Sequence, residues 1–283
     1  MIISDIKNIF QEELATLYNS SEITELFSIF IEKSTGFNKI QQRQFAQDHV
    51  SENVLNDLNI ALSELKTGKP YQQILGETEF YGFQFFFFFY VLIPRPETEE
   101  LLEIAIHEIQ NSKFKVQGLK ILDIGTGSGI IPIVLKKKFP NADISAIDFS
   151  EKALEMAKKN AEFHQVEINF LHQDYLNENL TEMYDVIISN PPYIGIEEAV
   201  EIEDSVKCFE PQMALFSPTS NALIFYEKIA KDCENHLSEN GMVFLEINQK
   251  LGIETKNLFV GVLSEVELVK DLSGNERFVR GVF

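Results

Sequence analysis

The sequence contains no tryptophan, little cysteine and few basic residues. Its 283 residues include two cysteines, and 44 Asp and Glu outnumber 24 Lys and Arg, giving a formal net charge of −20. Cys208 and Cys233 are too few for a disulfide framework and are not spaced as metal ligands. We therefore predict reduced thiols, no metal site and a cytoplasmic location, because disulfides are rare in that compartment. The acidic N-terminus also lacks the basic region and apolar run of a signal peptide.

The shortage of basic residues argues against direct binding of nucleic acid. Proteins draw most of their affinity for nucleic acids from Lys and Arg side chains placed on the phosphates. The one basic run, Lys136–Lys138, falls near the end of a predicted helix, where cations stabilise the negative end of the helix dipole. The acidity of the chain fits a basic protein partner better, because complementary charges favour association.

The sequence also lacks an apolar segment long enough to cross a membrane. Its most hydrophobic stretch, Phe83–Ile93, is FQFFFFFYVLI, far shorter than the roughly 20 residues of a membrane span. Aromatic and β-branched residues predict one strand of a hairpin there, with Gly82 near the turn. Five consecutive Phe break the alternation of a strand, so we expect some of Phe85–Phe89 to be exposed or covered by another domain.

Two kinds of periodicity divide the chain. Residues 1–75 carry apolar side chains at helical spacing and predict a small helical domain, followed by a β-hairpin linker over residues 76–95. In residues 96–283 a helix begins at Pro96, and strands alternate with helices from about residue 119, which predicts an α/β domain whose mostly parallel sheet is covered on both faces. We expect strands at 119–124, 144–147, 168–171, 186–189, 242–247, 266–270 and 278–283, and helices at 130–139, 150–163 and 222–237.

A glycine-rich loop follows the first of these strands. Asp123–Gly129 is DIGTGSG and opens a helix, so a ligand could approach the backbone and its free N–H groups closely. The loop lacks the Lys of a P-loop and the glycine spacing of a dinucleotide fingerprint. A ligand without phosphates fits better, and S-adenosylmethionine is such a ligand. The candidate cofactor residues in the loop are Gly125, Thr126, Gly127, Ser128 and Gly129.

Acidic residues follow the next two strands. Asp148 lies about 20 residues beyond the glycine loop, where a carboxylate can accept hydrogen bonds from ribose hydroxyls. It could instead cap the next helix, although Ser150 is better placed to do so. Asp174 and Tyr175 close the third strand. The carboxylate could accept from an adenine amino group and the ring could pack on the base, although an ordinary polar loop is the alternative.

The tetrapeptide Asn190-Pro191-Pro192-Tyr193 follows a buried-type strand, at the edge where ligands bind in open α/β sheets. An amide nitrogen is a poor nucleophile because its lone pair is delocalised. The Asn190 side-chain oxygen and the Pro191 carbonyl could hold its two N–H groups and favour a lone pair directed at a methyl donor. Tyr193 could stack on the planar target, and its ring face attracts a cation. A rigid turn without chemistry is the structural alternative.

Four blocks together resemble a known family: Pro70–Gly76, Leu92–Glu99 (LIPRPETE), Asp123–Gly129 and Asn190–Tyr193, with Glu210-Pro211 and Ala214-Leu215 as a weaker fifth match. They are similar to the bacterial glutamine methyltransferases that modify the Gly-Gly-Gln motif of class I peptide chain release factors, the PrmC/HemK family. The LIPRPETE block is the most specific, since other methyltransferases lack it.

The resemblance implies a Rossmann-like, seven-stranded class I S-adenosylmethionine-dependent methyltransferase domain, a hairpin linker and an N-terminal helical domain that helps to dock the release factor. It implies cofactor contacts at Gly125–Gly129, Asp148, Tyr175 and Asn190, S-adenosylhomocysteine as product, and the substrate glutamine at Asn190–Tyr193. The enzyme is expected to be a monomer.

The chain departs from the family pattern at a few positions. Tyr175 stands where a larger aromatic, often Trp, is usual; Asn248 and Leu251 stand where Gly and Gln are usual; and Glu276 replaces Asp. We expect none of these residues to touch the reaction centre.

Three other functions stay open at this point. A sister enzyme could act on a glutamine of a ribosomal protein, although the LIPRPETE block is less alike there. An adenine amino methyltransferase on DNA or RNA also uses Asn-Pro-Pro-Tyr, but the net charge and the lack of a basic recognition domain oppose it. A cofactor-binding scaffold without catalysis would not need Asn190.

Overall fold

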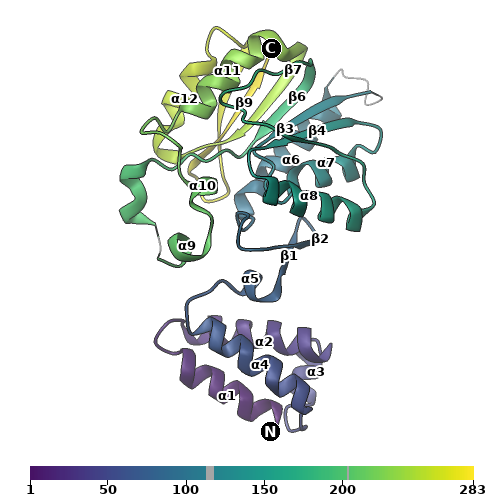
Figure 1. Cartoon of the computed structure of the whole chain (residues 1–283), viewed down its shortest axis with the longest axis vertical. Coiled ribbons are helices and arrows are strands. Elements are labelled where there is room, and N and C mark those ends of the chain that lie inside the picture. The colour runs from purple at the N-terminus through teal and green to yellow at the C-terminus, as the bar shows by residue number, and fades with distance from the viewer. Residues whose placement is uncertain (113–117, 203) are drawn as a thin grey trace. The chain divides into compact units, whose positions relative to one another are not determined.

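The chain folds into two units, Met1–Gly76 and Glu77–Phe283, each with its own core. The structure is a computed structural model and describes residues 1–112, 118–202 and 204–283 (Figure 1). No helix in these ranges is long and apolar enough to cross a bilayer. Both cysteines are free thiols; Cys208 is exposed and Cys233 is buried.

The first unit is a set of five helices: α1 (Ile3–Leu14), α2 (Ser20–Thr35), α3 (Lys39–Gln44), α4 (Glu52–Leu65) and α5 (Tyr71–Leu75). Local signals define their ends. The Asn19 side chain accepts from two backbone N–H groups at the start of α2, and Gly36 ends that helix in the left-handed conformation. Apolar stripes of α1, α2 and α4 form the core, with Phe10 against Phe27 at 5.4 Å between ring centroids.

The second unit begins with an antiparallel hairpin of β1 (Glu77–Phe80) and β2 (Phe83–Phe86). Its turn residues Tyr81 and Gly82 both have positive φ, as a two-residue hairpin requires. Phe80 and Phe85 are buried in the core of this unit. The expected linker hairpin therefore packs on the second unit.

The strand predicted over Phe83–Ile93 is wrong beyond Phe86, because a continuous strand would place Phe side chains on both faces. After Phe86 the chain leaves the extended conformation and buries Phe87, Val91 and Ile93 in a separate cluster. Phe88 and Phe89 are 41% and 65% exposed, which confirms that part of the Phe run faces solvent.

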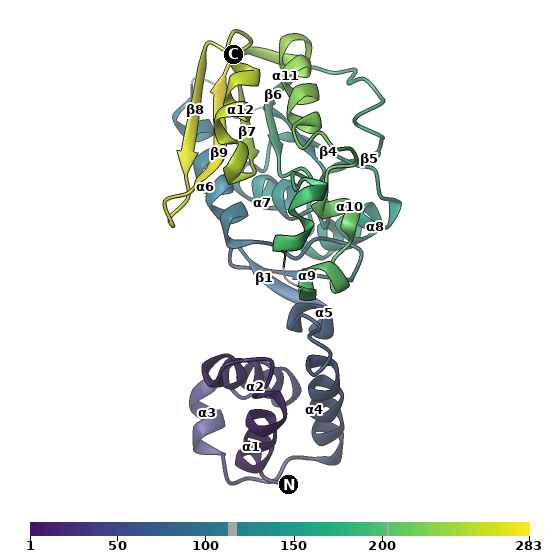
Figure 2. The same ribbon diagram turned by 90° about the vertical axis from the view of Figure 1, so that its left-hand side faces the viewer.

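A seven-stranded sheet forms the centre of the second unit, in the order β5-β4-β3-β6-β7-β9-β8. The strands are β3 (Lys120–Ile124), β4 (Asp143–Asp148), β5 (Asn169–His172), β6 (Tyr184–Ser189), β7 (Leu237–Glu246), β8 (Glu265–Lys270) and β9 (Glu276–Val282). β9 is antiparallel to both of its neighbours, and the other pairs are parallel (Figure 2). The predicted α/β class with a seven-stranded sheet is confirmed.

Helices cover both faces of the sheet, as the alternating pattern predicts. α6 (Pro96–Asn111), α7 (Ile130–Lys138) and α8 (Glu151–His164) lie on one face, and α11 (Ile224–His236) and α12 (Gly252–Phe259) lie on the other (Figure 1). Successive residues of β7 serve the two cores in turn: Phe244 packs under α6, and Leu245 packs under α11. The short elements η1 (Ile196–Glu201), α9 (Asp204–Phe209), α10 (Gln212–Leu215) and η2 (Gln249–Leu251) follow strand ends.

The strand order reverses between β3 and β6. The chain runs outward from β3 through β4 to β5, then returns to β6 on the other side of β3. Open α/β sheets bind ligands at the carboxyl ends of the strands that flank such a switch point. The glycine loop follows β3 and the Asn-Pro-Pro-Tyr tetrapeptide follows β6, so both lie at that point.

One helix end is predicted to limit stability. Gln165 ends α8 in the left-handed conformation, with φ 55° and ψ 47°. A residue with a Cβ pays about 1 kcal/mol or more for this conformation, whereas glycine does not. Gln165→Gly should raise the free energy of unfolding by ~1 kcal/mol, measured by urea denaturation. Asn240, with φ 61°, is the matched control: asparagine tolerates this region, so Asn240→Gly should gain less. Equal gains would contradict the conformational explanation.

Candidate active site

Strand register places the two predicted site loops side by side. Ile124 of β3 pairs with Ser189 of β6, so Gly125 and Asn190 begin adjacent loops. The Ser189 hydroxyl donates to the Ile124 carbonyl at 2.7 Å and ties the two strand ends together. Ser189 also pairs with Leu245 of β7, which places Glu246 beside Asn190. These three strand ends are the scaffold of the site.

A cavity of about 500 Å³ opens at these strand ends. This volume lies within the range of sites for small organic ligands and cofactors. Predicted residues that line the cavity are Gly125, Gly127, Asp148, Asp174, Tyr175, Asn190 and Pro192. Thr126, Ser128, Gly129, Pro191 and Tyr193 do not line it; Thr126 and Ser128 are buried behind the glycine loop.

The glycines of the loop have two different roles. Gly125 and Gly127 have positive φ, line the cavity, and have no atom within 4 Å of the position where a Cβ would stand. A side chain there would be strained and would occupy the open space beside the loop. Gly129 instead faces α8, where a Cβ would meet the Ala157 Cβ at 2.9 Å. Gly129 therefore permits close packing of α7 on α8, while Gly125 and Gly127 leave the backbone open to a ligand.

Asp148 connects the loop to the next helix. Its two carboxylate oxygens accept from the backbone N–H groups of Gly127 and Ser150, each at 2.8 Å. Ser150 caps α8, as the sequence predicts: its hydroxyl accepts from Ala153 N–H. Burial raises the pKa of Asp148, and the backbone N–H donors partly oppose this shift. The remaining lone pairs of Asp148 face a cavity that the residue lines, where ligand hydroxyls could donate to them.

Asp123 is a buried acid beneath the glycine loop. Neither of its carboxylate oxygens has a hydrogen-bond partner among the described residues. Burial raises the pKa of Asp123 to about 7, partly offset by the nearby Thr126 hydroxyl. Buried polar groups in native proteins are normally paired. Asp123 is fully buried and does not line the cavity, so it lies beneath the loop as a buried acid and not as a direct ligand contact.

Tyr175 is fixed from behind. Its hydroxyl donates to Asp232 Oδ2 at 2.7 Å, and Lys228 Nζ lies 4.8 Å from its ring centroid. The residue is only 4% exposed, and it lines the cavity. Asp174 lies beside it and accepts from Asn177 Nδ2 at 2.8 Å. A flat, oriented ring at the cavity wall is suited to packing on a purine.

Behind the Asn-Pro-Pro-Tyr tetrapeptide lies a chain of hydrogen bonds. Asn190 Nδ2 donates to the Thr98 hydroxyl at 3.1 Å, and that hydroxyl donates to Glu246 Oε2 at 2.8 Å. The Tyr193 hydroxyl donates to the other oxygen of Glu246 at 3.1 Å. Thr98 and Glu246 are 2% and 1% exposed. Burial raises the pKa of Glu246 to about 7, and burial beside this carboxylate raises the pKa of Tyr193 as well.

Sequence reasoning gave no role to Thr98 or Glu246. Thr98 lies within the LIPRPETE block, and Glu246 precedes Asn248, so both stand in segments that the sequence had singled out. Their position in these segments could have indicated a role. Nothing in the sequence shows, however, that two residues 148 positions apart are in contact.

Another part of the LIPRPETE block positions the cavity wall. Arg95 forms an ion pair with Glu210 at 2.6 Å, and Glu210 also accepts from Ile93 N–H at 3.1 Å. The Glu210 side chain is 1% exposed. Because α10, which supplies Gln212, Met213 and Ala214 to the cavity, begins two residues later, this pair anchors that wall.

One expectation about the departures is wrong. Asn248 touches the tetrapeptide: its Nδ2 donates to the Tyr193 carbonyl at 3.3 Å and to Glu198 Oε1 at 2.8 Å. The cause is strand register, because β7 ends next to β6 and the residues after both strands must meet. Asn248 thus links the tetrapeptide to η1 in this chain.

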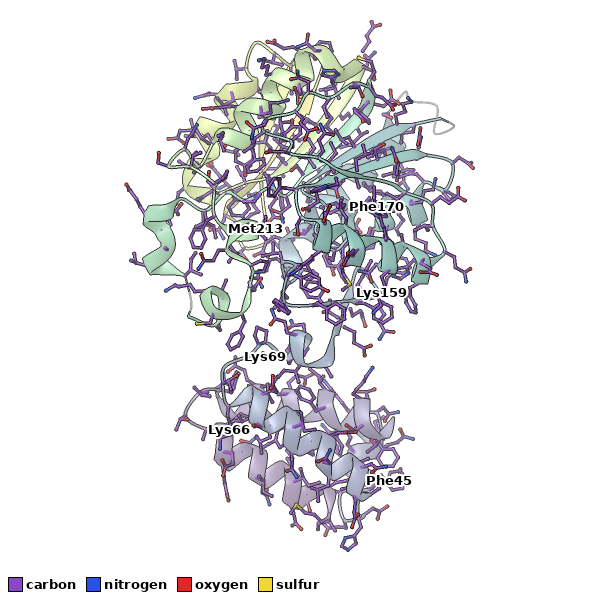
Figure 3. The ribbon with its side chains drawn as sticks, in the orientation of Figure 1. Phe45, Lys66, Lys69, Lys159, Phe170 and Met213 are labelled. Atoms are coloured by element: carbon purple, nitrogen blue, oxygen red, sulfur yellow. The ribbon has the colours of Figure 1, made fainter. Side chains whose placement is uncertain are left out.

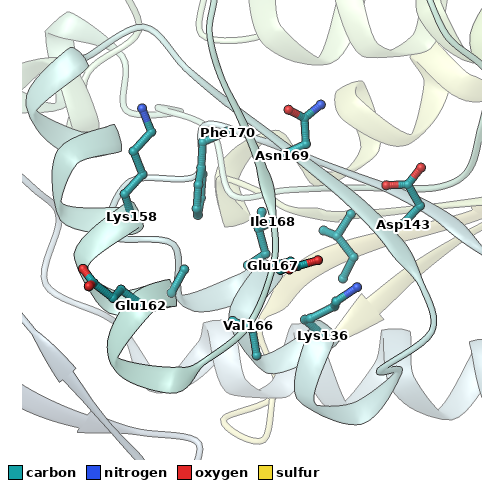
Figure 4. Close-up of a pocket in the computed structure, with 11 residues that line it drawn as sticks. Lys136, Asp143, Lys158, Glu162, Val166, Glu167, Ile168, Asn169 and Phe170 are labelled. Carbon is teal, nitrogen blue, oxygen red and sulfur yellow. The ribbon is translucent and has the colours of Figure 1, made fainter.

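A second hollow lies at the opposite, amino-terminal edge of the sheet. Its lining includes Asp143 at the start of β4, Asn169 at the start of β5, and Lys136 and Lys158 (Figure 4). It is open to solvent, and none of the predicted site residues lines it. In the described ranges no group of three or more His, Cys, Asp and Glu is arranged to hold a metal ion.

The role assigned to Asp148 can be tested with an isosteric change. In Asp148→Asn, one of the two backbone N–H groups would face an NH₂ group instead of an acceptor. We expect affinity for S-adenosylhomocysteine, measured by calorimetry, to fall by roughly 10-fold or more, since an unpaired buried group costs about 1–3 kcal/mol. Asp143→Asn, at the exposed opposite end of the same strand, is the control and should bind normally. Unchanged affinity in Asp148→Asn would remove Asp148 from the site.

Comparison with known proteins identifies the family. Residues 104–206 match the model of the methyltransferase small domain. The release factor glutamine methyltransferase of Flavobacterium psychrophilum is 41% identical over 99% of both chains, and that of Lactococcus lactis is 38% identical over 86% of this chain and 88% of its own.

Solved structures agree with the fold. A methyltransferase from Pyrococcus furiosus superposes with a TM-score of 0.50 at 17% identity, covering 82% of this chain and 98% of its own. A 16S rRNA N2 G1207 methyltransferase from T. thermophilus gives 0.51 at 19% identity, covering 73% and 49%. The predictions of an enzyme, of a class I methyltransferase fold and of S-adenosylmethionine as cofactor are confirmed. The chain belongs to the release factor glutamine methyltransferase family.

Proposed function

We propose that this enzyme transfers a methyl group from S-adenosylmethionine to the side-chain amide nitrogen of the glutamine in the Gly-Gly-Gln motif of class I peptide chain release factors. The observation that carries the proposal is the orientation of Asn190. Its Nδ2 is committed to Thr98, so its Oδ1 is the part of the amide left to accept from a ligand, and Asn190 lines the cavity.

The reaction needs the protein to hold a weak nucleophile rather than to deprotonate it. Asn190 Oδ1 and the Pro191 carbonyl are two acceptors for the two N–H groups of a substrate amide. The bound cofactor supplies the electrophilic methyl group. The methylated nitrogen releases its proton to solvent after transfer, so no strong base is needed, and the partly buried Asn190–Tyr193 segment contributes positioning and electrostatic preorganisation. Tyr193, held by Glu246 and Asn248, keeps the tetrapeptide rigid.

The residues proposed for this reaction either line the cavity or belong to the two loops that border it. Gly125–Gly129 supply the loop, Asp148 accepts from the ribose, and Asp174 and Tyr175 form the wall for the base. Asn190 serves both ligands, and Pro191, Pro192 and Tyr193 complete the substrate side.

A protein substrate is favoured over a nucleic acid by the charges of the chain. The net charge is −20, and the one basic run is used internally. Lys136 and Lys137 each donate to a backbone carbonyl at 2.6 Å, Ala142 and His164 respectively. We propose that the release factor is the partner, that the N-terminal helical unit helps to dock it, and that the enzyme acts as a monomer in the cytoplasm without binding nucleic acid.

An exposed aromatic surface beside the cavity supports a protein partner. Phe88 and Phe89 lie 5.7 Å and 5.1 Å, between ring centroids, from Tyr90, which lines the cavity. Lys159 of α8, labelled in Figure 3, places its ammonium 5.1 Å from the Phe88 ring centroid. Exposed apolar surface next to a site is typical of protein interaction.

The main prediction concerns Asn190 and the choice of substrate. Labelled S-adenosylmethionine should methylate a purified release factor, and should methylate neither duplex DNA nor ribosomal proteins in parallel reactions. Asn190→Ala should abolish methyl transfer, with a rate lowered roughly 100-fold or more, because an oriented acceptor at the reacting group is lost. Its circular dichroism and thermal unfolding should stay as in the wild type. Wild-type rates in Asn190→Ala would refute the mechanism, and labelling of ribosomal protein or DNA instead would refute the substrate.

A second prediction concerns the aromatic surface. The double change Phe88→Ser and Phe89→Ser should raise KM for the release factor about 10-fold, since buried aromatic residues dominate protein interfaces, and should leave S-adenosylhomocysteine binding unchanged. Val260→Ser is the control, because Val260 is 62% exposed at the end of α12, away from the cavity lining. An unchanged KM in the double variant would exclude this surface from docking.

A further inference from the structure

Glu246 and Thr98 do not line the cavity, yet both stand directly behind Asn190. We infer that Glu246, acting through the Thr98 hydroxyl, sets which way the Asn190 side-chain amide faces, and that both are positioning residues for methyl transfer. The inference rests on the proposed function, because it concerns how the substrate amide is held.

The number of hydrogens available decides the direction of these hydrogen bonds. A carboxylate has none and can only accept, whereas a hydroxyl has one to donate. The single hydrogen of Thr98 goes to Glu246 Oε2 at 2.8 Å, so the Thr98 oxygen can only accept from its other neighbour. Asn190 must therefore present Nδ2 to Thr98, as it does at 3.1 Å.

This hydrogen bond decides which way the amide of Asn190 faces. The oxygen and nitrogen of Asn190 are nearly equal in size, so packing cannot distinguish the two orientations, and hydrogen bonds alone select one. With Nδ2 turned to Thr98, Oδ1 is on the other side as an acceptor. In the flipped orientation Asn190 would offer N–H groups to a substrate amide nitrogen that is itself a donor.

The same carboxylate also holds Tyr193. Its Oε1 accepts from the Tyr193 hydroxyl at 3.1 Å, so the first and last residues of the tetrapeptide are both positioned by Glu246. Glu246 is itself fixed by its place on β7 and by the Tyr226 hydroxyl, which donates to its backbone carbonyl at 2.9 Å. Thr98 is fixed in the first turn of α6, two residues after Pro96.

A direct role for Glu246 as a proton acceptor does not fit this geometry. The residue is 1% exposed, and its two oxygens are occupied by Thr98 and Tyr193. Glu246 therefore acts through its neighbours and not on the substrate.

The direction of the hydrogen bonds from Asn190 through Thr98 depends on the ionisation of Glu246. Burial raises its pKa to about 7; hydrogen bonds from Thr98 and Tyr193 and the charge of Arg277 lower it, and Glu97 raises it. The Tyr226 hydroxyl contacts the backbone carbonyl of Glu246 and not its carboxylate. Once protonated, Glu246 could donate to Thr98, whose own hydrogen could then turn to Asn190 and favour the flipped amide. The competent orientation should thus be lost as pH falls through about 7.

The test uses Thr98→Val, which keeps the shape but removes the hydroxyl, and Thr98→Ser, which restores it. We expect Thr98→Val to lower kcat on a release factor by ~100-fold or more, in the range seen when one preorganised hydrogen bond is removed, with KM and S-adenosylhomocysteine affinity within about 3-fold. Thr98→Ser should recover most of kcat. Thermal unfolding of each variant checks that the fold is intact.

A readout that needs no turnover completes the test. In ¹⁵N-labelled enzyme, the side-chain NH₂ signals of Asn190, assigned with Asn190→Ala, should titrate with a midpoint near pH 7 in the wild type. The titration should disappear in Glu246→Gln and in Thr98→Val. Asp123, whose pKa is also raised to about 7, is unchanged in both variants, so a surviving titration would be assigned to it and would overturn the inference.

The two proposals can fail separately. A wild-type enzyme that leaves the release factor unmethylated refutes the proposed function, while the Asn190 signals still decide whether Glu246 orients the amide. Methylation of the release factor with an undiminished kcat in folded Thr98→Val keeps the proposed function and refutes the inference.

Discussion

The parallel pairing of β3 with β6 is the constraint on which the whole site depends. Residues between these strands form two other strands and two helices, so Gly125 and Asn190 meet only because Ile124 and Ser189 are in register. A slip by one residue would turn every side chain of β6 to the other face of the sheet. Buried residues alternate between two separate cores along β6, and this alternation resists such a slip. Side-chain packing in the two cores therefore fixes the register of β6 and, with it, the spacing between the two loops.

Much of the fold and part of the site follow from local pattern. Strand and helix alternation after residue 119 predicted the sheet, and the glycine loop and tetrapeptide were placed at strand ends by the same periodicity. The run of Phe was misassigned beyond Phe86, because burial of Phe87 against α8 is a tertiary effect. Thr98 and Glu246 were missed for a related reason: each looks ordinary in its own segment, and only their contact across the fold gives them a role.

Buried acids are concentrated at the carboxyl edge of the sheet. Asp123 and Glu246 lie on the ends of β3 and β7 on either side of β6, and burial raises the pKa of both to about 7. Desolvation of a carboxylate is costly, so two such groups are a cost to folding rather than a source of stability. The inferred role of Glu246 is to fix the direction of the hydrogen bonds from Thr98 and Tyr193. At this edge stability is given up locally for orientation.

The insertion of β9 between β7 and β8 has a consequence for the order of assembly. β8 leaves the ribosome before β9, yet among the strands of the described residues β8 pairs with β9 alone. While the chain is being made, β7 has an open edge and β8 has no strand to pair with. Apolar residues of α12 that pack against β8 and β9 cannot be buried until both strands have been synthesised. A transient species with an unpaired strand edge is prone to association, so insertion of β9 covers the edge of β7 through which nascent copies could otherwise pair.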